Sequence, residues 1–441
     1  MAVSRLGLRL LACTLWVSVV AYTASWIQRH VPEPYMDEIF HVPQFTHYCQ
    51  GKWTWDPKIT TPAGLYLVTL AAHTVLSSLG MPLACTDLAW IRWTNAGALL
   101  FLPILCFFLL RATHRHMDTL TPLVCASLPP LYFFGFLYYT DVWSVVTILA
   151  ALAAMEHRQH VLASLLGFVS LWFRQTNIVW VAFVMGAALV KDMQRLARVP
   201  SHITPPLLRL AQSWATYPAL GRTAVIYLPT FVCFGAFMVW NHGTIVLGDQ
   251  SHHQASLHLS HVNYFFAFAL FFGAPVLVSH AYTRVSSRLV MLSIALGALS
   301  TLAVRYGTVV HPFLLADNRH YTFYVWRRII NRTSWSRYAL VSIYTSSALL
   351  WYKALSVKQC TLWILGWCMA TCLTLIPSPL MEPRYYLVPY MILRLYVPAP
   401  PKIWLYAEAL WLVCINLGTI WVFGQHTFAW PQEAGLQRFM W

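Results

Sequence analysis

The stretch AGLYLVTLAAHTVLSSLG, residues 63–80, decides how the rest of the chain crosses a membrane. It is nearly as long as the ~20 apolar residues that span a bilayer. If it spans, the basic loops 111–117 and 191–222 come out on the non-cytosolic side. If it does not span, every alternate loop is basic, as the cytosolic enrichment of Lys and Arg requires. We therefore predict a helix that lies in or dips into the interface.

The composition around this stretch is that of an integral membrane protein. The chain has 441 residues, of which 59% are hydrophobic and 10% charged, whereas soluble domains carry roughly 25% charged residues. We predict an all-α polytopic membrane protein, with 1–441 as a single integral membrane domain of about 13 transmembrane helices. Apolar runs of spanning length cover 7–28, 94–110, 118–137, 142–156, 161–173, 177–190, 223–241, 262–281, 289–310, 338–352, 360–376, 385–397 and 403–424. The first run follows basic residues and is expected to be a retained signal anchor.

The basic excess is explained by orientation in the membrane. With a cytosolic N-terminus and 13 spans, the cytosolic segments hold 15 of the 29 Lys and Arg but three of the 14 acids, which accounts for +12 of the net +15. There is no basic run and no nucleic-acid motif, so nucleic-acid binding is excluded. Three loops follow from this topology: a first non-cytosolic loop 29–93, a basic cytosolic loop 191–222, and a non-cytosolic loop 311–337.

The segment YMDEIFHVPQ, residues 35–44, places two acids beside the membrane. Carboxylates are costly near hydrocarbon unless they have a role or a partner. Asp37 and Glu38 lie four and three residues before His41, so both neighbour it if the segment is helical. An acid at a helix start is also stabilised by the helix dipole. A catalytic acid and a simple capping acid are both compatible with this pattern.

Four further polar segments fall on the same non-cytosolic side. Their sequences are WTWDPKITTPAGLY (53–66), FRQTNIVW (173–180), NHGTIVLGDQSHHQASLHLSHVNYFF (241–266) and HPFLLADNRHYTFYVWRR (311–328), with EPRYY (382–386) as an addition. Arginine binds phosphate through two N–H groups at once. The histidines of 241–266 match no zinc spacing, so no metal is expected.

Two modifications are compatible with the same side of the membrane. Cys49 and Cys85 share the first non-cytosolic loop. The sequence is compatible with a disulfide between them and with two free thiols. The sequon at Asn331 lies on the side where glycosylation occurs, and its occupancy is left open.

Acids and arginines at the membrane edge favour a transferase that uses a lipid-linked sugar donor. A transporter would place its ionisable residues in mid-span, whereas here they lie in loops. The lipid chain stays in the bilayer, the phosphate lies near Arg, and the sugar projects outward. One base is needed to take the proton of the acceptor hydroxyl, and a phosphate whose charge is neutralised leaves without a metal.

The five segments resemble, in order along nearly the whole chain, the dolichyl-phosphate-glucose-dependent alpha-1,2-glucosyltransferases of the endoplasmic reticulum. This family adds the terminal third glucose to the lipid-linked oligosaccharide for N-glycosylation. The resemblance implies a GT-C fold with amphipathic helices in the first lumenal loop, a multi-pass chain in the endoplasmic reticulum membrane, and a lumenal active site. It also implies dolichyl phosphate glucose as donor, a diglucosylated dolichyl-diphosphate oligosaccharide as acceptor, and inversion at the transferred sugar.

The resemblance also implies roles for particular residues. Asp37 is expected to be the base, with Glu38 as the alternative base or as its positioning partner. The other expected site residues are Arg319, His320, Arg384 and Arg174 for the donor phosphate, and His41, Gln44, Trp55, Asp249, His252 and His253 for sugars. Loop 249–261 is hypothesised to read the acceptor. The alternatives are a mannosyltransferase of the same class, a polytopic transporter, and a non-catalytic subunit.

Overall fold

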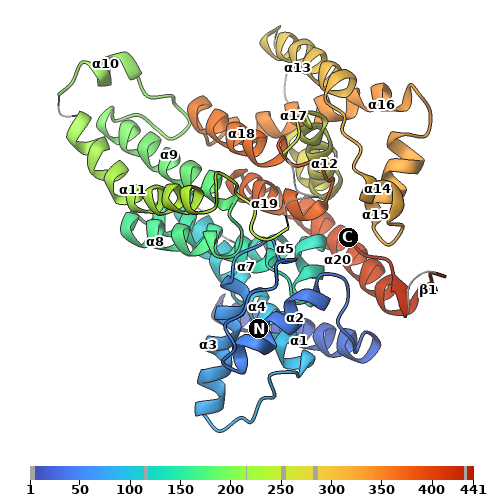
Figure 1. The fold of residues 1–441 in the computed structure, drawn as a ribbon. Coiled ribbons are helices and arrows are strands. Elements are labelled where there is room, and N and C mark those ends of the chain that lie inside the picture. The colour runs from blue at the N-terminus through green and yellow to red at the C-terminus, as the bar shows by residue number, and fades with distance from the viewer. Residues whose placement is uncertain (1–4, 114–117, 215, 250–254, 282–286, 432–434) are drawn as a thin grey trace. The chain divides into compact units, whose positions relative to one another are not determined.

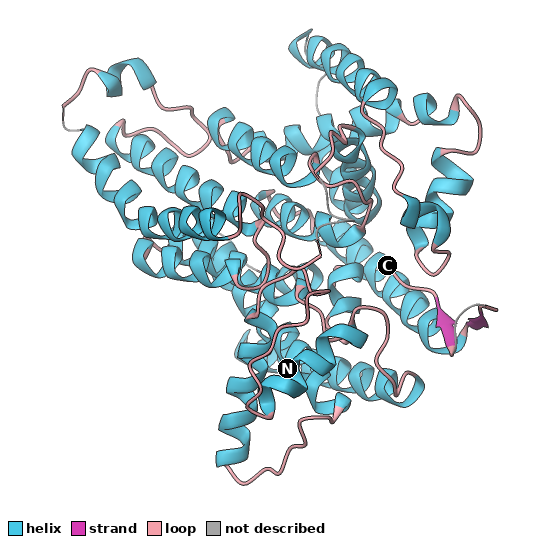
Figure 2. Cartoon of the chain, viewed as in Figure 1, coloured by secondary structure: helices cyan, strands magenta, loops and turns pink. Residues whose placement is uncertain are grey.

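The computed structural model describes residues 5–113, 118–214, 216–249, 255–281, 287–431 and 435–441. These residues are mostly helical, with one small pair of strands near the C-terminus (Figures 1 and 2). The chain divides into two units, Met1–Val184 with Val225–His252, and Met185–Ala224 with His253–Trp441. We describe each unit by itself.

The first unit is built around a nearly completely buried helix. Its helices are α1 (Arg5–His30), α2 (Glu38–Cys49), α3 (Gly64–Ser78), α4 (Leu88–Thr113), α5 (Leu120–Ala126), α6 (Pro129–Phe134), α7 (Asp141–Glu156) and α8 (His160–Leu171). Two more, α9 (Asn177–Leu196) and α11 (Thr216–Trp240), begin in one unit and end in the other. Helix α7 packs against α4 and α8 and buries almost every side chain, because its sequence is apolar on all sides.

The second unit is organised around α12. Its elements are α10 (Leu207–Ala211), α12 (Ser260–Ala281), α13 (Ser287–Tyr306), α14 (Pro312–Ala316), α15 (Tyr321–Val325), η1 (Trp326–Ile330), α16 (Ser336–Ala339), α17 (Val341–Ser356), α18 (Thr361–Leu375), η2 (Pro383–Tyr386), α19 (Leu387–Tyr396), α20 (Lys402–Gln425), β1 (Thr427–Ala429) and β2 (Leu436–Arg438). Helix α12 packs against α17 and α20. A buried ion pair between Arg394 and Glu408 joins α19 to α20, with 2.7 Å between Nη2 and Oε2.

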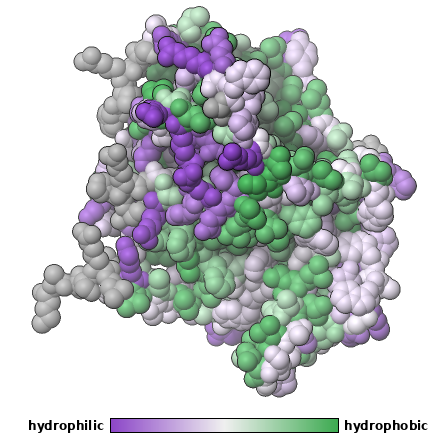
Figure 3. Space-filling view, turned by 90° about the vertical axis from the view of Figure 1, so that its left-hand side faces the viewer, coloured by the Kyte–Doolittle hydropathy of each residue, from purple (hydrophilic) through white to green (hydrophobic). Residues whose placement is uncertain are grey.

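The long helices expose large hydrophobic side chains, as helices in contact with lipid do. Six of the described helices are long and apolar enough to cross a membrane: Arg9–His30, Leu88–Thr113, Thr216–Trp240, Ser260–His280, Ser287–Tyr306 and Lys402–Gln425. Large hydrophobic side chains on them are exposed, and hydrophobic areas cover part of the face in Figure 3. Exposed apolar surface of this extent is stable only in contact with lipid or another apolar partner. The chain is a polytopic membrane protein.

The count of spans is not fixed by these helices. The stretch 63–80 forms α3, whose 15 residues are fewer than the ~20 that span a bilayer. Helices α8 and α18 are also shorter than ~20 residues, although the apolar runs 161–173 and 360–376 are predicted to span. The figure of about 13 spans therefore stays a prediction.

One predicted span is interrupted. The run 118–137 forms the two short helices α5 and α6 instead of one helix. Pro129 and Pro130 lack the N–H that a continuing helix needs, and the residue before a proline avoids the helical region. Leu128 accordingly has an extended ψ of 118°. The chain after α6 is then free to run as a buried non-helical segment, 135–140.

Cys49 and Cys85 form a disulfide, which resolves the alternative left open by the sequence. The bond joins the last residue of α2 to the loop that precedes α4, across 36 residues of chain. It closes the segment 49–85, which begins at the end of the helix that follows Asp37 and contains Trp55 and α3.

We expect Cys49→Ser and Cys85→Ser to lower the melting temperature in detergent equally, and the double variant to lower it no further. Each change removes the same cross-link, which stabilises a protein by about 2–4 kcal/mol. Differential scanning fluorimetry measures the shift, with Cys233→Ser at an exposed free cysteine as the control. Additive losses would contradict the pairing.

Candidate functional site

Glu38 is completely buried and its carboxylate is fully occupied. Arg92 donates from Nε to Oε1 at 2.8 Å and from Nη2 to Oε2 at 2.6 Å. The backbone N–H groups of Tyr35 and Tyr138 donate to the same carboxylate at 2.9 and 2.7 Å. Four donors on two oxygens satisfy the lone pairs of an ionised carboxylate. Glu38 is thus fixed in the protein interior by four hydrogen bonds.

Arg92 uses its remaining N–H groups to hold the chain that leads into α2. Nη1 donates to Gln28 Oε1 at 3.2 Å and to the carbonyl of Val31 at 2.6 Å, and Nη2 donates to the carbonyl of Glu33 at 3.0 Å. Sequence reasoning missed this arginine, which lies 54 residues from Glu38. The available signal was a charged residue just before the apolar run 94–110, since a charge at membrane depth requires a partner.

Asp37 occupies a different environment from its neighbour. It lies at the N-terminus of α2 and is half-buried. Its backbone N–H donates to the hydroxyl of Tyr139 at 3.1 Å. Met36 before it has φ of 54°, a left-handed conformation that is uncommon for a residue with a side chain and that changes the chain direction. The two adjacent acids therefore have different surroundings: Glu38 is buried and paired with Arg92, whereas Asp37 is half-buried at the start of α2.

The predicted sugar-binding residues of the first loop lie together around α2. His41 Nδ1 is 2.6 Å from the Tyr66 hydroxyl, and the rings of Trp55 and Tyr66 are 6.0 Å apart. The Gln44 amide donates to the carbonyl of Thr54 at 2.7 Å and accepts from the Asp56 N–H at 2.8 Å. Gln44 is thus placed where it fixes the loop that carries Trp55.

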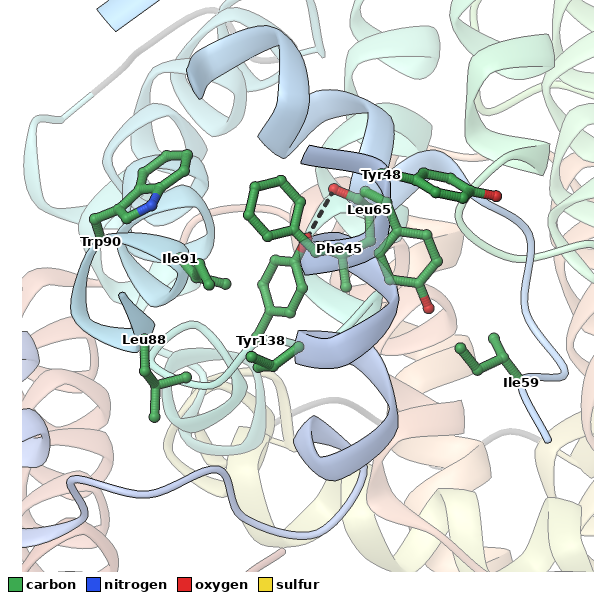
Figure 4. Packing of buried hydrophobic residues seen from close by; sticks show 10 residues of the cluster. Phe45, Tyr48, Ile59, Leu65, Leu88, Trp90, Ile91 and Tyr138 are labelled. Carbon is green, nitrogen blue, oxygen red and sulfur yellow. Dashed lines mark hydrogen bonds between the residues drawn. The ribbon is translucent and has the colours of Figure 1, made fainter. Parts of the chain in front are cut away.

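An apolar cluster holds α2 against α3 and α4 (Figure 4). Phe45 of α2 lies in it with Leu65 of α3 and Trp90 of α4, and Tyr48 of α2 lies at its edge. Tyr138 crosses the cluster and donates from its hydroxyl to the Leu65 carbonyl at 3.3 Å and to Thr69 Oγ1 at 2.8 Å. The same residue supplies the N–H that binds Glu38, so the apolar cluster and the ion pair share one segment.

Segments that are far apart in the sequence meet on the loop 57–60. The Gln175 side chain donates to the Thr60 carbonyl at 2.8 Å, and the Asp249 N–H donates to the Pro57 carbonyl at 2.8 Å. Gly248 has φ of 59°, and a Cβ there would lie 2.3 Å from the Pro57 carbonyl oxygen, so a side chain would not fit. The first unit therefore contains three of the five predicted polar segments, 35–44, 53–66 and 173–180, and the beginning of a fourth, 241–249. His252 and His253 lie outside the described residues.

Arg174, a predicted phosphate ligand, is paired with a carboxylate in the first unit. Its Nη2 lies 2.5 Å from Oδ1 of Asp141, whose side chain is buried at the start of α7. Asn177, three residues on, donates to Ser144 Oγ at 2.9 Å and to the Ser170 carbonyl at 2.9 Å. The segment 173–180 is thereby tied to α7 and α8.

The second unit holds the other phosphate candidates. Arg319 donates from Nε to Asp317 Oδ1 at 2.9 Å and from Nη2 to Oδ2 at 2.7 Å. His320 Nε2 lies 3.8 Å from the same carboxylate. Burial raises the pKa of Asp317, but the hydrogen bonds of Arg319 and the charge of His320 outweigh burial, so this pKa lies below its ordinary value. Arg384 of η2 donates from Nε at 2.8 Å to Oε2 of Glu382, the residue just before this turn.

Two histidines of the loop 249–261, which is hypothesised to read the acceptor, form a buried pair in the second unit. The rings of His258 and His261 stack with their centres 4.9 Å apart, and both side chains are buried. The N–H of His258 donates to the Ile376 carbonyl at 2.9 Å. Burial lowers the pKa of His258 from 6.5 to about 4, so its imidazole is neutral at pH 7.

Comparison with known proteins gives one family. Residues 31–395 match the model of the DIE2/ALG10 family. A mouse protein is 36% identical over 98% of both chains, and a human protein is 34% identical over 98% of both. An Arabidopsis thaliana protein is 32% identical over 96% of this chain and 99% of its own. All three are named Dol-P-Glc:Glc(2)Man(9)GlcNAc(2)-PP-Dol alpha-1,2-glucosyltransferase. No solved structure matches the chain.

We expect Arg92→Met and Glu38→Gln each to destabilise the protein strongly, Arg92→Met by about 3–5 kcal/mol, because removal of one partner leaves a buried charge without its counter-ion. The double variant Glu38→Met/Arg92→Met should be less damaged than Arg92→Met alone. Melting temperature and monodispersity in detergent measure the effect. Single variants as stable as the wild type would show that the pair does not hold this unit together.

We expect the stability of the protein to fall as the pH drops from about 6.5 to about 4, in part because of His258. In this window the unfolded chain binds a proton on this imidazole and the folded chain does not, so stability increases with pH. The melting temperature of His258→Asn should depend less on pH than that of the wild type. His242→Asn, at an exposed histidine, is the control; equal slopes in all three proteins would contradict the assignment.

Proposed function

Because this chain belongs to the DIE2/ALG10 family, we propose that it transfers glucose from dolichyl phosphate glucose to the diglucosylated dolichyl-diphosphate-linked oligosaccharide. The bond formed is the terminal alpha-1,2 linkage of the N-glycan precursor. Similarity over nearly the full length of relatives that carry this printed activity is the observation behind this function. Those names specify glucose, so they favour this activity over the mannosyltransferase alternative, and they give no support to a transporter.

The proposed architecture is a GT-C transferase of about 13 spans in the endoplasmic reticulum membrane. Its N-terminus is cytosolic, and loop 29–93 faces the lumen. The Cys49–Cys85 disulfide supports this orientation, because disulfides persist in the lumen and are reduced in the cytosol. The distribution of Lys and Arg among the loops supports the same orientation.

Asp37 is the proposed base, and Glu38 is its positioning partner. Protonation of Glu38 would weaken its ion pair with Arg92 and its two backbone hydrogen bonds, so this carboxylate is poorly suited to accept a proton in each turnover. Asp37 is half-buried, lies at a helix start, and is held through its backbone by Tyr139. A base with this placement is accessible to an acceptor hydroxyl, which is the first requirement for general base catalysis.

The proposed reaction is a single displacement with inversion. The acceptor hydroxyl oxygen attacks the anomeric carbon of the donor glucose while Asp37 takes the hydroxyl proton. The bond from that carbon to the phosphate oxygen breaks, and dolichyl phosphate leaves with the electron pair. Arg319 and His320 are the proposed partners of the phosphate, with Arg384 and Arg174 as further candidates, since a fixed positive charge stabilises a leaving group. His41, Trp55 and Asp249 are the proposed sugar contacts. No metal is required in this scheme.

We expect Asp37→Asn to lower kcat by about 10²–10⁴-fold, the range for loss of a general base, with little change in melting temperature. The assay supplies dolichyl phosphate glucose and the diglucosylated acceptor to purified protein in detergent, with a chelator present. Glu33→Gln, an exposed acid in the same loop, is the matched control.

Each outcome of this assay has a separate meaning. Wild-type transfer that survives in Asp37→Asn would remove Asp37 as the base. Transfer that stops in the wild type only when chelator is added would overturn metal independence. A wild type that transfers mannose from dolichyl phosphate mannose instead of glucose would replace the proposed function by the mannosyltransferase alternative.

A further inference from the structure

The described residues 427–431 and 435–441, called the C-terminal segment below, form a small folded element at the end of α20. Its strands β1 and β2 pair antiparallel, with Phe428 opposite Gln437. Arg438 is buried, and its Nη1 donates at 2.9 Å to the carbonyls of both Phe423 and Gly424. These carbonyls lie in the last turn of α20, where acceptors lack partners within the helix. The segment is thereby fixed to a long helix.

This segment contacts the Arg319 side chain from two directions. Gln437 Oε1 accepts from Arg319 Nη1 at 3.0 Å. The guanidinium carbon of Arg319 lies 4.5 Å from the centre of the Trp430 ring, within cation–π range. Trp430 also donates from its indole nitrogen to Asn318 Oδ1 at 2.9 Å. With Asp317 on a third side, the orientation of the guanidinium plane is determined.

The backbone of the segment binds the same motif. Met440 donates its N–H to the Arg319 carbonyl at 2.9 Å and accepts from the Tyr321 N–H at 3.0 Å. His320 Nδ1 lies 3.0 Å from the Trp441 carbonyl oxygen. The Trp441 ring packs against that of Tyr321, with centres 5.1 Å apart. These contacts hold Arg319 and His320, the two proposed phosphate partners. The contacting residues are far apart in the sequence: 118 residues separate Arg319 from Gln437.

We infer that the C-terminal segment is a positioning element of the donor-phosphate site, in which Gln437 fixes the direction of Arg319 without adding charge. This inference rests on the proposed function. Asp317 already offsets the charge of Arg319, so a second carboxylate would leave little positive charge for a phosphate, whereas a neutral amide oxygen orients the guanidinium and leaves the charge unchanged. A fixed guanidinium also loses less conformational entropy when it binds the donor.

The test changes the charge of Gln437 without changing its shape. We expect Gln437→Glu to raise KM for dolichyl phosphate glucose about tenfold, because the added carboxylate keeps the hydrogen bond but competes with the donor phosphate for the charge of Arg319. KM for the acceptor and the melting temperature should stay near the wild-type values. Gln437→Met, which lacks the acceptor oxygen, should also raise the donor KM. Gln425→Glu, which adds the same charge at an exposed position of α20, is the control.

The two parts of the proposal fail differently. If the segment only stabilises the fold, Gln437→Glu keeps the hydrogen bond to Arg319 and shows the wild-type donor KM, and Gln437→Met lowers the melting temperature alone. That result overturns the inference and leaves the proposed function intact. If the wild type transfers no glucose, the proposed function fails. The inference is then tested by the affinity of dolichyl phosphate for the wild type and for Gln437→Glu. Equal affinities in that measurement overturn it.

Discussion

The buried ion pair between Glu38 and Arg92 is the constraint on which the first unit depends. A carboxylate and a guanidinium in the protein interior are each costly, and each is stable there only because the other is present and all their hydrogen bonds are made. Through this pair, the end of α1, the loop before α2, the start of α4 and the segment before α7 meet at one point. The position of Asp37 is a consequence of this meeting, since it is the residue next to the fixed carboxylate.

In both units, arginines that are candidate phosphate ligands form ion pairs with carboxylates. Arg174, Arg319 and Arg384 each lie beside a carboxylate, those of Asp141, Asp317 and Glu382. A carboxylate partner reduces the net positive charge and fixes the direction of the guanidinium before any ligand is present. A phosphate that binds at such a residue shares it with the carboxylate. In the proposed donor-phosphate site, affinity would then depend on geometry as well as on charge, and a neutral neighbour such as Gln437 would orient the guanidinium without opposing the phosphate.

The fold brings its functional segments together by interrupting helices. The prolines after α5 prevent one continuous span over 118–137 and allow the buried segment 135–140, which supplies Tyr138 and Tyr139 to the two acids. The disulfide closes the first loop beside α2, and Gly248 allows a close approach to the loop 57–60. Each interruption replaces regular hydrogen bonding by specific contacts between segments that are distant in the sequence.

The sequence by itself determined the class of protein, the polar segments and the family. These properties depend on composition, on runs of apolar residues and on local motifs, all of which can be read along one chain. It predicted that 63–80 would not span, but it treated 118–137 as one span, since helix breaks at proline depend on the packing around them. The tertiary structure decided which residues are partners. Arg92 for Glu38, Tyr139 for Asp37 and Gln437 for Arg319 lie 54, 102 and 118 residues apart. No local pattern encodes such pairs, because the burial that makes an unpaired charge costly exists only when the chain has folded.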